Sequence, residues 1–142
     1  TQFNIIGGVL NGTFAPTVTL VGGAGNTVPV YSTNTGRYTL VGNRCFADVY
    51  LTGDGGAEGA GSGQVTVALP FAASATHPSD YFFGGRGINN ATNYQLMLQI
   101  AGNASVASVA YWSSVTAMPG LTGDDQNNAT RSIRLHFDYE IA

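Results

Sequence analysis

Apolar and polar residues alternate with a period of two in several short segments of the chain. In the segment Arg44–Leu51, every second residue is small or aliphatic, and the residues between them are charged or aromatic. The segments Thr17–Val21, Gln64–Leu69 and Arg131–Ile141 alternate in a similar way. This period is typical of β-strands that bury one of their two faces. The pattern therefore predicts a chain built from strands.

Turn-forming residues separate nine segments that we predict to be strands. Gly42 and Asn43 form a two-residue link between two of them, which predicts a tight hairpin with a type II′ turn. One segment contains Pro29, which has no N–H group to donate, so it is predicted to be an edge strand. The predicted strands are Thr17–Val21, Val28–Tyr31, Arg37–Val41, Arg44–Leu51, Gln64–Leu69, Tyr81–Phe83, Tyr94–Ile100, Ser105–Trp112 and Arg131–Ile141.

Short strands with turn signals about every 8–12 residues are typical of antiparallel β-sandwiches. We therefore predict an all-β, antiparallel, jelly-roll-like β-sandwich that forms a single domain over residues 1–142. Cys45 is expected in its core, and His136 is expected at an exposed strand position. The glycines of Gly84–Gly87 are expected to shape a bulge or a turn. The segment Thr52–Gly63 contains six glycines and is predicted to be a long loop.

The composition restricts the partners that the chain can have. Charged residues make up only 9% of the chain, against about 25% in an average protein. The five basic residues are all arginine and the net charge is −3, so we expect no binding to nucleic acid. No apolar run approaches the ~20 residues of a membrane span, so we expect no membrane insertion. A surface with so few charges either meets water through Asn, Ser, Thr and main-chain groups or is covered by other chains. Depletion of charge is typical of interface cores, which gives weight to the second option.

Few residues are candidates for catalysis. His77 and Asp80 are a possible pair for a hydrolase triad, but no nucleophile-elbow sequence accompanies them. The acidic residues of two loops are candidates for glycoside hydrolysis or calcium binding, and solvated loop positions are the alternative. Glycine-rich loops hold catalytic geometry poorly, so we expect no enzyme activity and no metal or cofactor. These acidic residues are Asp54, Glu58, Asp124 and Asp125.

Aromatic residues make up 11% of the chain, and several are candidates for a sugar-binding platform. The rings of Trp and Tyr combine an apolar face with a polar group, which suits a wet interface. Burial in the core is the alternative for each of them. Trp112 is the strongest candidate, because the run Tyr111–Ser114 falls at the end of a predicted strand. The candidates are Tyr31, Tyr50, Tyr81, Tyr111 and Trp112.

The segment Arg37–Phe46, the sequence Gly61–Gly63 and the segment Gln64–Phe71 resemble the C-terminal tip modules of tailed-bacteriophage tail fibres and tailspikes. In those modules a Y-T-x-V-G-N hairpin is followed by a G-S-G-x-V-x-V-x-L-P-F segment. The resemblance covers the residues from about Tyr38 to Phe71, roughly a quarter of the chain, and is weaker in the last strand. The chain departs from the family at Cys45, where an aliphatic residue is expected.

The resemblance implies a β-sandwich that assembles as a parallel homotrimer at the distal tip of a tail fibre or tailspike of the virion. It implies binding to a bacterial cell-surface glycan or another outer-membrane component for host recognition and attachment. Because the chain begins at Thr1, we expect it to be the C-terminal fragment of a longer fibre chain. The alternatives are a structural trimerisation or folding cap, a capsid-decorating protein, and a glycan-cleaving domain.

The family motif marks no receptor-contact residue, so the candidates come from loops and strand ends of this chain. Arg86 is expected to fork onto a carboxylate or phosphate of the glycan, and Trp112 is expected to stack on a sugar. Three weak sites on one trimer would act together by avidity. The candidate receptor-binding residues are Tyr50, Asp54, Arg86, Asn89, Tyr111, Trp112, Asp124 and Asp125.

Overall fold

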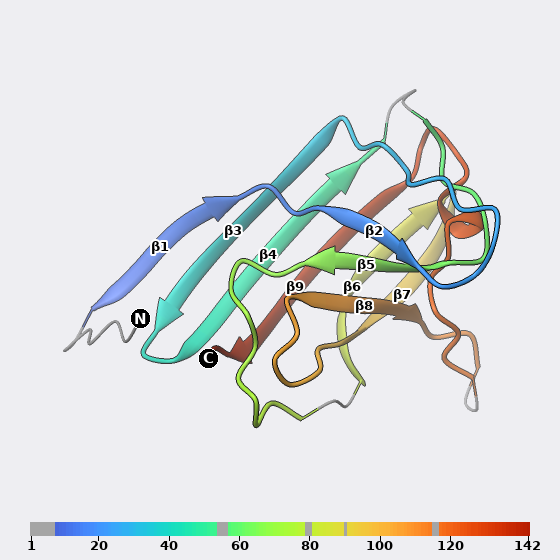
Figure 1. Cartoon of the computed structure of the whole chain (residues 1–142). Helices are drawn as coiled ribbons and strands as arrows, with labels where there is room; N and C mark the ends of the chain where they lie inside the picture. Colours follow the sequence, from blue (N-terminus) through green and yellow to red (C-terminus); the bar gives the residue numbers. More distant parts are fainter. Residues whose placement is uncertain (1–7, 54–56, 79–80, 90, 115–116) are drawn as a thin grey trace.

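The computed structural model describes residues 8–53, 57–78, 81–89, 91–114 and 117–142. Across these residues the chain forms one antiparallel sheet of nine strands, with the order β1-β3-β4-β9-β6-β7-β8-β5-β2 (Figure 1). This confirms the predicted all-β antiparallel class, whereas assembly as a homotrimer stays a prediction. The elements are β1 (Val9–Phe14), β2 (Val18–Val21), β3 (Thr33–Val41), β4 (Arg44–Thr52), β5 (Gln64–Ala68), β6 (Tyr81–Asn89), β7 (Thr92–Gln99), β8 (Val106–Tyr111), the 3-10 helix η1 (Asp124–Gln126) and β9 (Ser132–Glu140).

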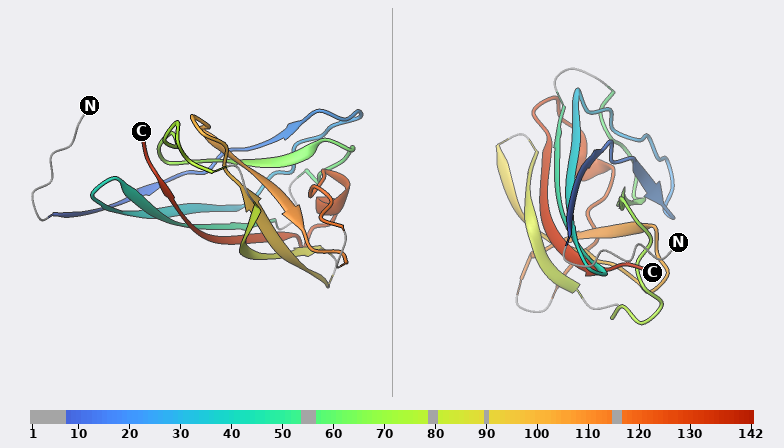
Figure 2. Two further views of the ribbon diagram at one scale, coloured as in Figure 1. Left: turned by 90° about the horizontal axis from the view of Figure 1, so that it is seen from below. Right: turned by 90° about the vertical axis from the view of Figure 1, so that its left-hand side faces the viewer.

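The sheet curls so that its two flanks face each other. Strands β1, β3, β4 and β9 lie side by side in one layer, and β2, β5 and β8 cross in front of them (Figures 1 and 2). β1 pairs with β3 at one edge of the sheet, and β2 pairs with β5 at the other edge. Only residues 15–17 separate β1 from β2, so one short passage of the chain connects both edges. The two layers are therefore portions of one curled sheet.

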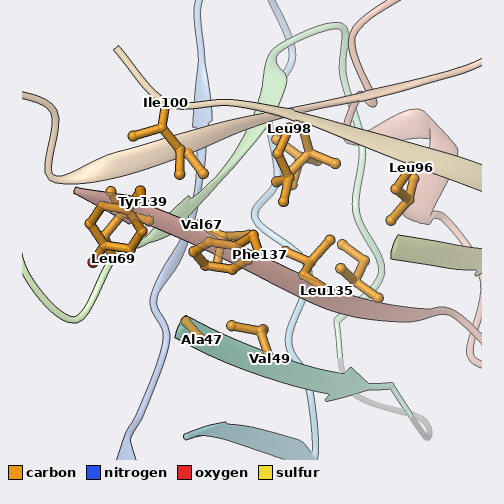
Figure 3. Close-up of a cluster of buried hydrophobic side chains, with 14 of the residues drawn as sticks. Ala47, Val49, Val67, Leu69, Leu96, Leu98, Ile100, Leu135, Phe137 and Tyr139 are labelled. Carbon is orange, nitrogen blue, oxygen red and sulfur yellow. The ribbon is translucent and has the colours of Figure 1, made fainter. Parts of the chain in front are cut away.

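The core lies between the two layers and is built from the inward faces that the period-two pattern predicts. On β4, Cys45 and Ala47 are fully buried, while the residues that alternate with them, Arg44, Phe46 and Asp48, are exposed, as expected. On β9, Leu135 and Phe137 are buried and point toward Leu98 of β7 (Figure 3). Each aliphatic or aromatic side chain buried here contributes about 1.5–3 kcal/mol relative to its exposure. The alternation of these two strands therefore positions their other face toward solvent.

The link between β3 and β4 is the predicted hairpin. Val41 pairs with Arg44 across the two-residue turn. Gly42 has a φ of 61°, and Asn43 does not share a positive φ. A positive φ at the first central residue alone is the requirement of a type II′ turn, so the prediction is confirmed.

Two aromatic rings that cover glycines attach β1 to β3. Gly12 lies opposite Tyr38, and Gly36 lies opposite Phe14. A Cβ atom at either glycine would overlap the opposite ring. The Tyr38 ring in turn meets Phe71 edge-on, with ring centroids 4.9 Å apart. This packing holds β1 on the sheet although its sequence does not alternate, and the period-two pattern therefore missed it.

The predicted strand Val28–Tyr31 is wrong. Pro29 donates no hydrogen bond, and the segment is held instead by single contacts, such as Val30 N–H to the carbonyl of Ala57 at 2.9 Å. The glycines of Gly84–Gly87 lie inside β6, where the pairing register with β7 shifts between Phe83 and Gly85. The predicted bulge is therefore confirmed.

A fully buried arginine joins three loops at the end of the sheet near η1. Arg131 Nη1 donates to the carbonyl of Asn128 at 2.9 Å, and Nη2 donates to the carbonyls of Ala57, at 2.8 Å, and Val30. Its guanidinium carbon lies 5.5 Å from the ring centroid of Tyr31. Within the described residues, no carboxylate forms an ion pair with it. Main-chain carbonyls therefore stabilise its charge.

Candidate ligand-binding groove

An open groove of about 820 Å³ lies on the outer face of the sheet, over β3, β4, β9 and β6. Three of the five arginines of the chain line it. Asp48 is the only acidic residue among the described residues that line it. The groove therefore carries an excess of positive charge in a chain whose net charge is −3. The lining side chains considered below are Thr35, Arg37, Asp48, Tyr50, Arg86, Arg134 and His136.

Cross-strand register explains why these side chains meet. Tyr50 on β4 is the Cα partner of Arg134 on β9, and Arg134 is the partner of Arg86 on β6. Thr35 on β3 precedes them and Gln95 on β7 follows them in the same register. These five residues form what we call the outer row. Because neighbouring strands are about 4.8 Å apart, the outer row covers about 19 Å of the sheet surface.

The two arginines of the outer row are held by neutral partners. Arg86 donates from Nε to Asn93 Oδ1 at 2.9 Å and also from Nη2 to the same oxygen. Arg134 lies over the ring of Tyr50, 4.6 Å from its centroid, and donates from Nη2 to its hydroxyl at 3.2 Å. A guanidinium has five N–H donors, so both arginines keep further donors for a ligand. Like charges directly opposite each other destabilise a sheet, and an anion bound between them would remove this cost.

The carboxylate of the groove is engaged with its own neighbours. In the row beside the outer row, Asp48 lies between Arg37 and His136. Asp48 Oδ1 and His136 Nδ1 are 2.6 Å apart. The side chain of His136 is 76% exposed, which confirms its predicted position. Asp48 therefore balances the charge beside the outer row rather than the charges of the two arginines within it.

The structure brings two of the predicted site residues, Tyr50 and Arg86, together in this groove. The side chain of Trp112 is exposed, and its main-chain N–H donates to the carbonyl of Gln95 at 3.0 Å. Trp112 therefore lies beside the end of the outer row, although it does not line the groove.

Tyr111 is half-buried and meets Tyr94 edge-on, with ring centroids 5.0 Å apart. Burial raises the pKa of Tyr111, and the negative charge of Asp125 raises it further. Asn89 is buried, and its Nδ2 donates to Asn127 Oδ1 at 3.0 Å. These two predicted residues thus pack at the end of the sheet near η1, and neither of them lines the groove.

The predicted acidic residues of the second loop bind main-chain groups. Asp124 Oδ1 accepts a hydrogen bond from the N–H of Gly61 at 2.9 Å. Asp125 Oδ2 accepts from the N–H of Thr122 at 2.9 Å and from its hydroxyl at 2.8 Å. Both carboxylates therefore stabilise the loop around η1. The remaining predicted residue, Asp54, lies outside the described residues.

Sequence reasoning did not assign five of the seven lining side chains named above to the site, and the arginines among these five are Arg37 and Arg134. The alternation of the last strand does place Arg134 on the outward face, together with His136. The sequence pattern does not show the order of the strands in the sheet. In the structure β9 pairs with β4 on one side and with β6 on the other. The meeting of Arg134 with Arg86 and Tyr50 follows from that order.

No three His, Cys, Asp or Glu side chains gather into a metal-holding group within the part of the chain that the structure describes. None of the described helical segments has the length and apolar character needed to cross a membrane.

Comparison with known proteins shows a similarity of fold. No protein-family model matches the chain, and no curated protein matches its sequence. The chain is similar to the Dettilon tailspike protein in its crystal structure, with a TM-score of 0.62 and 16% sequence identity. The match covers 93% of this chain and 24% of the tailspike chain, so the chain spans about a quarter of that protein. The curled sheet described above is thus similar to part of a phage tailspike.

Proposed function

We propose that this chain is a receptor-binding module of a phage tail fibre or tailspike. It acts at the distal tip of the virion tail and binds a glycan of the bacterial surface during attachment. The observation that carries this proposal is the open groove along the outer row, where Arg86, Arg134 and Tyr50 meet. The similarity of fold to a tailspike supports the tail-associated role.

The dimensions of the groove suit an extended polymer. A second groove of about 440 Å³ shares Arg37 and Asp48 with the first and continues over β1 and β3. Neutral hydrogen-bonding side chains, among them Asn11 and Thr39, line this second groove. A glycan chain presents many hydroxyl groups along its length, which such side chains bind. Together the two grooves form one track across five strands.

Assembly as a homotrimer would place three such grooves on one tip. Exposed apolar side chains such as Val9 and Val41, which are Cα partners on β1 and β3, provide surface for contacts between copies. Three weak sites bound together gain affinity without tighter single contacts. Light scattering is expected to give a mass near three times 14.7 kDa. A mass of one chain at micromolar concentration would contradict the trimer.

We propose binding without cleavage of the glycan. The carboxylates of Asp124 and Asp125 accept hydrogen bonds from main-chain N–H groups of their own loop, which supports a structural role for them. Incubation with the bound polysaccharide is expected to release no oligosaccharides. Release that disappears on substitution of Asp54 or Asp124 would show a glycan-cleaving domain instead.

The proposed function is tested by labelling cells with the fluorescent protein across a panel of bacterial strains. Tyr50 and Phe46 form a matched pair, because both lie on the outer face of β4 and are 38% and 39% exposed. Tyr50→Ala is expected to lose most of the labelling, whereas Phe46→Ala keeps it, because only Tyr50 lines the groove. Periodate oxidation of the cells is expected to abolish labelling, and protease treatment is expected to leave it.

A structural trimerisation or folding cap is the second candidate function. The exposed apolar side chains at the edge strand β1, Val9 and Leu10, favour it. A protein that forms trimers but labels no strain would support this second function and refute the first. A capsid-decorating role would instead show as binding to phage heads.

A further inference from the structure

The distribution of arginine over the chain points to one kind of ligand. Of the five arginines, Arg131 is buried and Arg44 pairs with the carboxylate of Asp138. The other three line the groove. Within the described residues, the side chains of Arg86 and Arg134 hydrogen-bond to or stack on neutral partners only. A chain with so few basic residues thus gathers most of them on one face.

The register places two positively charged residues at facing positions. Arg86 and Arg134 are direct cross-strand partners, and like charges at such positions destabilise a sheet. Within the described residues, Asp48 is the acid that lines the groove, and it is bound to His136 in the neighbouring row. A carboxylate that bridges the two guanidiniums would remove the repulsion and gain charge-assisted hydrogen bonds.

We propose that the outer row binds the carboxylate of an acidic sugar within a bacterial surface polysaccharide. This inference rests on the proposed function and specifies the class of receptor. Arg86 and Arg134 bind the carboxylate between them, because the planar guanidinium fork matches the two oxygens of a carboxylate. Tyr50, already packed against Arg134, supplies apolar surface to the sugar ring beside that carboxylate.

The polymer follows the track from β6 toward β1. Arg37 lies in both grooves, so it is placed to meet a second acidic sugar farther along the chain of sugars. All three arginines line the first groove. In the second groove Arg37 is the basic residue, and the other lining residues are neutral apart from Asp48. A regularly repeating polymer with one acidic sugar per repeat fits this spacing of charge better than a uniformly charged one.

The test uses polysaccharides purified from the strains that the protein labels. Each polysaccharide is used as extracted and after carbodiimide activation and borohydride reduction, which converts carboxylates into hydroxymethyl groups. Binding is measured by biolayer interferometry with the intact protein. Reduction is expected to weaken binding about tenfold or more, since a charged hydrogen bond is removed from each site. The wild-type affinity is also expected to fall as salt is raised.

Two variants identify the arginines, and a third is the matched control. Arg86→Gln and Arg134→Gln are each expected to weaken binding of the unreduced polysaccharide about tenfold. They are also expected to make binding less sensitive to reduction of the carboxylates than wild-type binding is, because one of the two guanidiniums is gone. Arg44→Gln removes the same charge from the same face of the sheet, outside the groove, and is expected to leave affinity unchanged. Circular dichroism checks that all three variants fold.

The outcomes separate this inference from the proposed function. Equal binding before and after reduction would overturn the acidic-sugar assignment while the glycan-binding function stands. Binding restricted to phosphate-bearing polymers would also overturn it and assign the arginines to phosphate. If the protein labels no strain and binds no polysaccharide, the proposed function fails, and the inference fails with it. Binding lost equally in Arg44→Gln would show a non-specific charge effect and overturn the site.

Discussion

Replacement of the buried Arg131 tests how the loops around the sheet end are held together. Its guanidinium donates to carbonyls of three segments that are far apart in the sequence, at Asn128, Ala57 and Val30. Arg131→Met keeps the apolar stem and removes these three donated hydrogen bonds. Hydrogen bonds of a charged donor are worth about 1.5–3 kcal/mol each, so the gross loss is about 5–9 kcal/mol.

Part of that loss is offset, because Met removes a buried charge whose desolvation costs several kcal/mol. Val30 and Ala57 are exposed residues, so water can hydrate their carbonyls in the variant. We therefore expect the free energy of unfolding to fall by about 2–4 kcal/mol, measured by urea denaturation. Arg44→Met is the control, because its ion pair with Asp138 is exposed and is worth about 0–1 kcal/mol.

Arg131→Lys separates the geometry from the charge. Lysine keeps a buried positive charge but has no planar fork to reach three carbonyls at once. We therefore expect Arg131→Lys to be at least as destabilising as Arg131→Met. A lysine variant as stable as wild type would refute the reasoning, because the charge alone would then suffice.

Three further changes test other parts of the structure. Arg86→Gln is expected to raise the free energy of unfolding by about 0.2–1 kcal/mol, because it removes the repulsion with Arg134, and a loss of stability in urea would contradict this. Gly85→Ala is expected to lower it by about 1–3 kcal/mol or more, since the new Cβ would overlap the carbonyl of Arg134, and an unchanged urea midpoint would show that the strands separate freely. Burial raises the pKa of Tyr139 above 10.0, so its contribution to stability is complete below pH 10 and is lost as pH rises further. The Tyr139 hydroxyl alone is expected to lower the free energy of unfolding of the wild type by about 1.4 kcal/mol per pH unit in that range. If Tyr139→Phe loses stability with pH as steeply as the wild type, Tyr139 is not the group responsible.

The strands that the sequence predicts well are those whose two faces differ sharply. On β4, small buried residues alternate with charged or aromatic exposed ones, so the pattern identifies both faces of the strand. β1 carries no such contrast, because Gly12 lies under the ring of Tyr38 from the neighbouring strand. That packing joins residues distant in sequence, and local alternation does not report it.

The candidate site could be predicted only in part for the same reason. Tyr50 and Arg86 carry suitable chemistry and were identified singly, but Arg134 completes the site only because β9 lies between β4 and β6. In the loop before η1, the spacing of Thr122 and Asp125 resembles that of a capping box, in which the acid binds the main-chain N–H three residues earlier. That local signal indicates a structural role, which the sequence reasoning did not weigh for Asp125.

The charge-poor surface gains a more specific interpretation from the structure. Two pairs lie on the outer face: Arg44 with Asp138, and His136 with Asp48. Within the described part of the chain, the two arginines of the outer row form no ion pair with an acidic side chain. The few charges of this face thus leave one place where an anion can be recognised. Exposed apolar residues such as Val9 lie at the edge strand instead, where contacts between copies are expected.

The central claim is that the outer face of the sheet, rather than the loop around η1, receives the glycan. Backbone amide chemical shifts of the isotope-labelled protein, followed during titration with fragments of the bound polysaccharide, test this most directly. The largest changes are expected along β4, β9 and β6 around Tyr50, Arg134 and Arg86. Changes centred instead on Thr122–Gln126, with the outer row unaffected, would contradict the account.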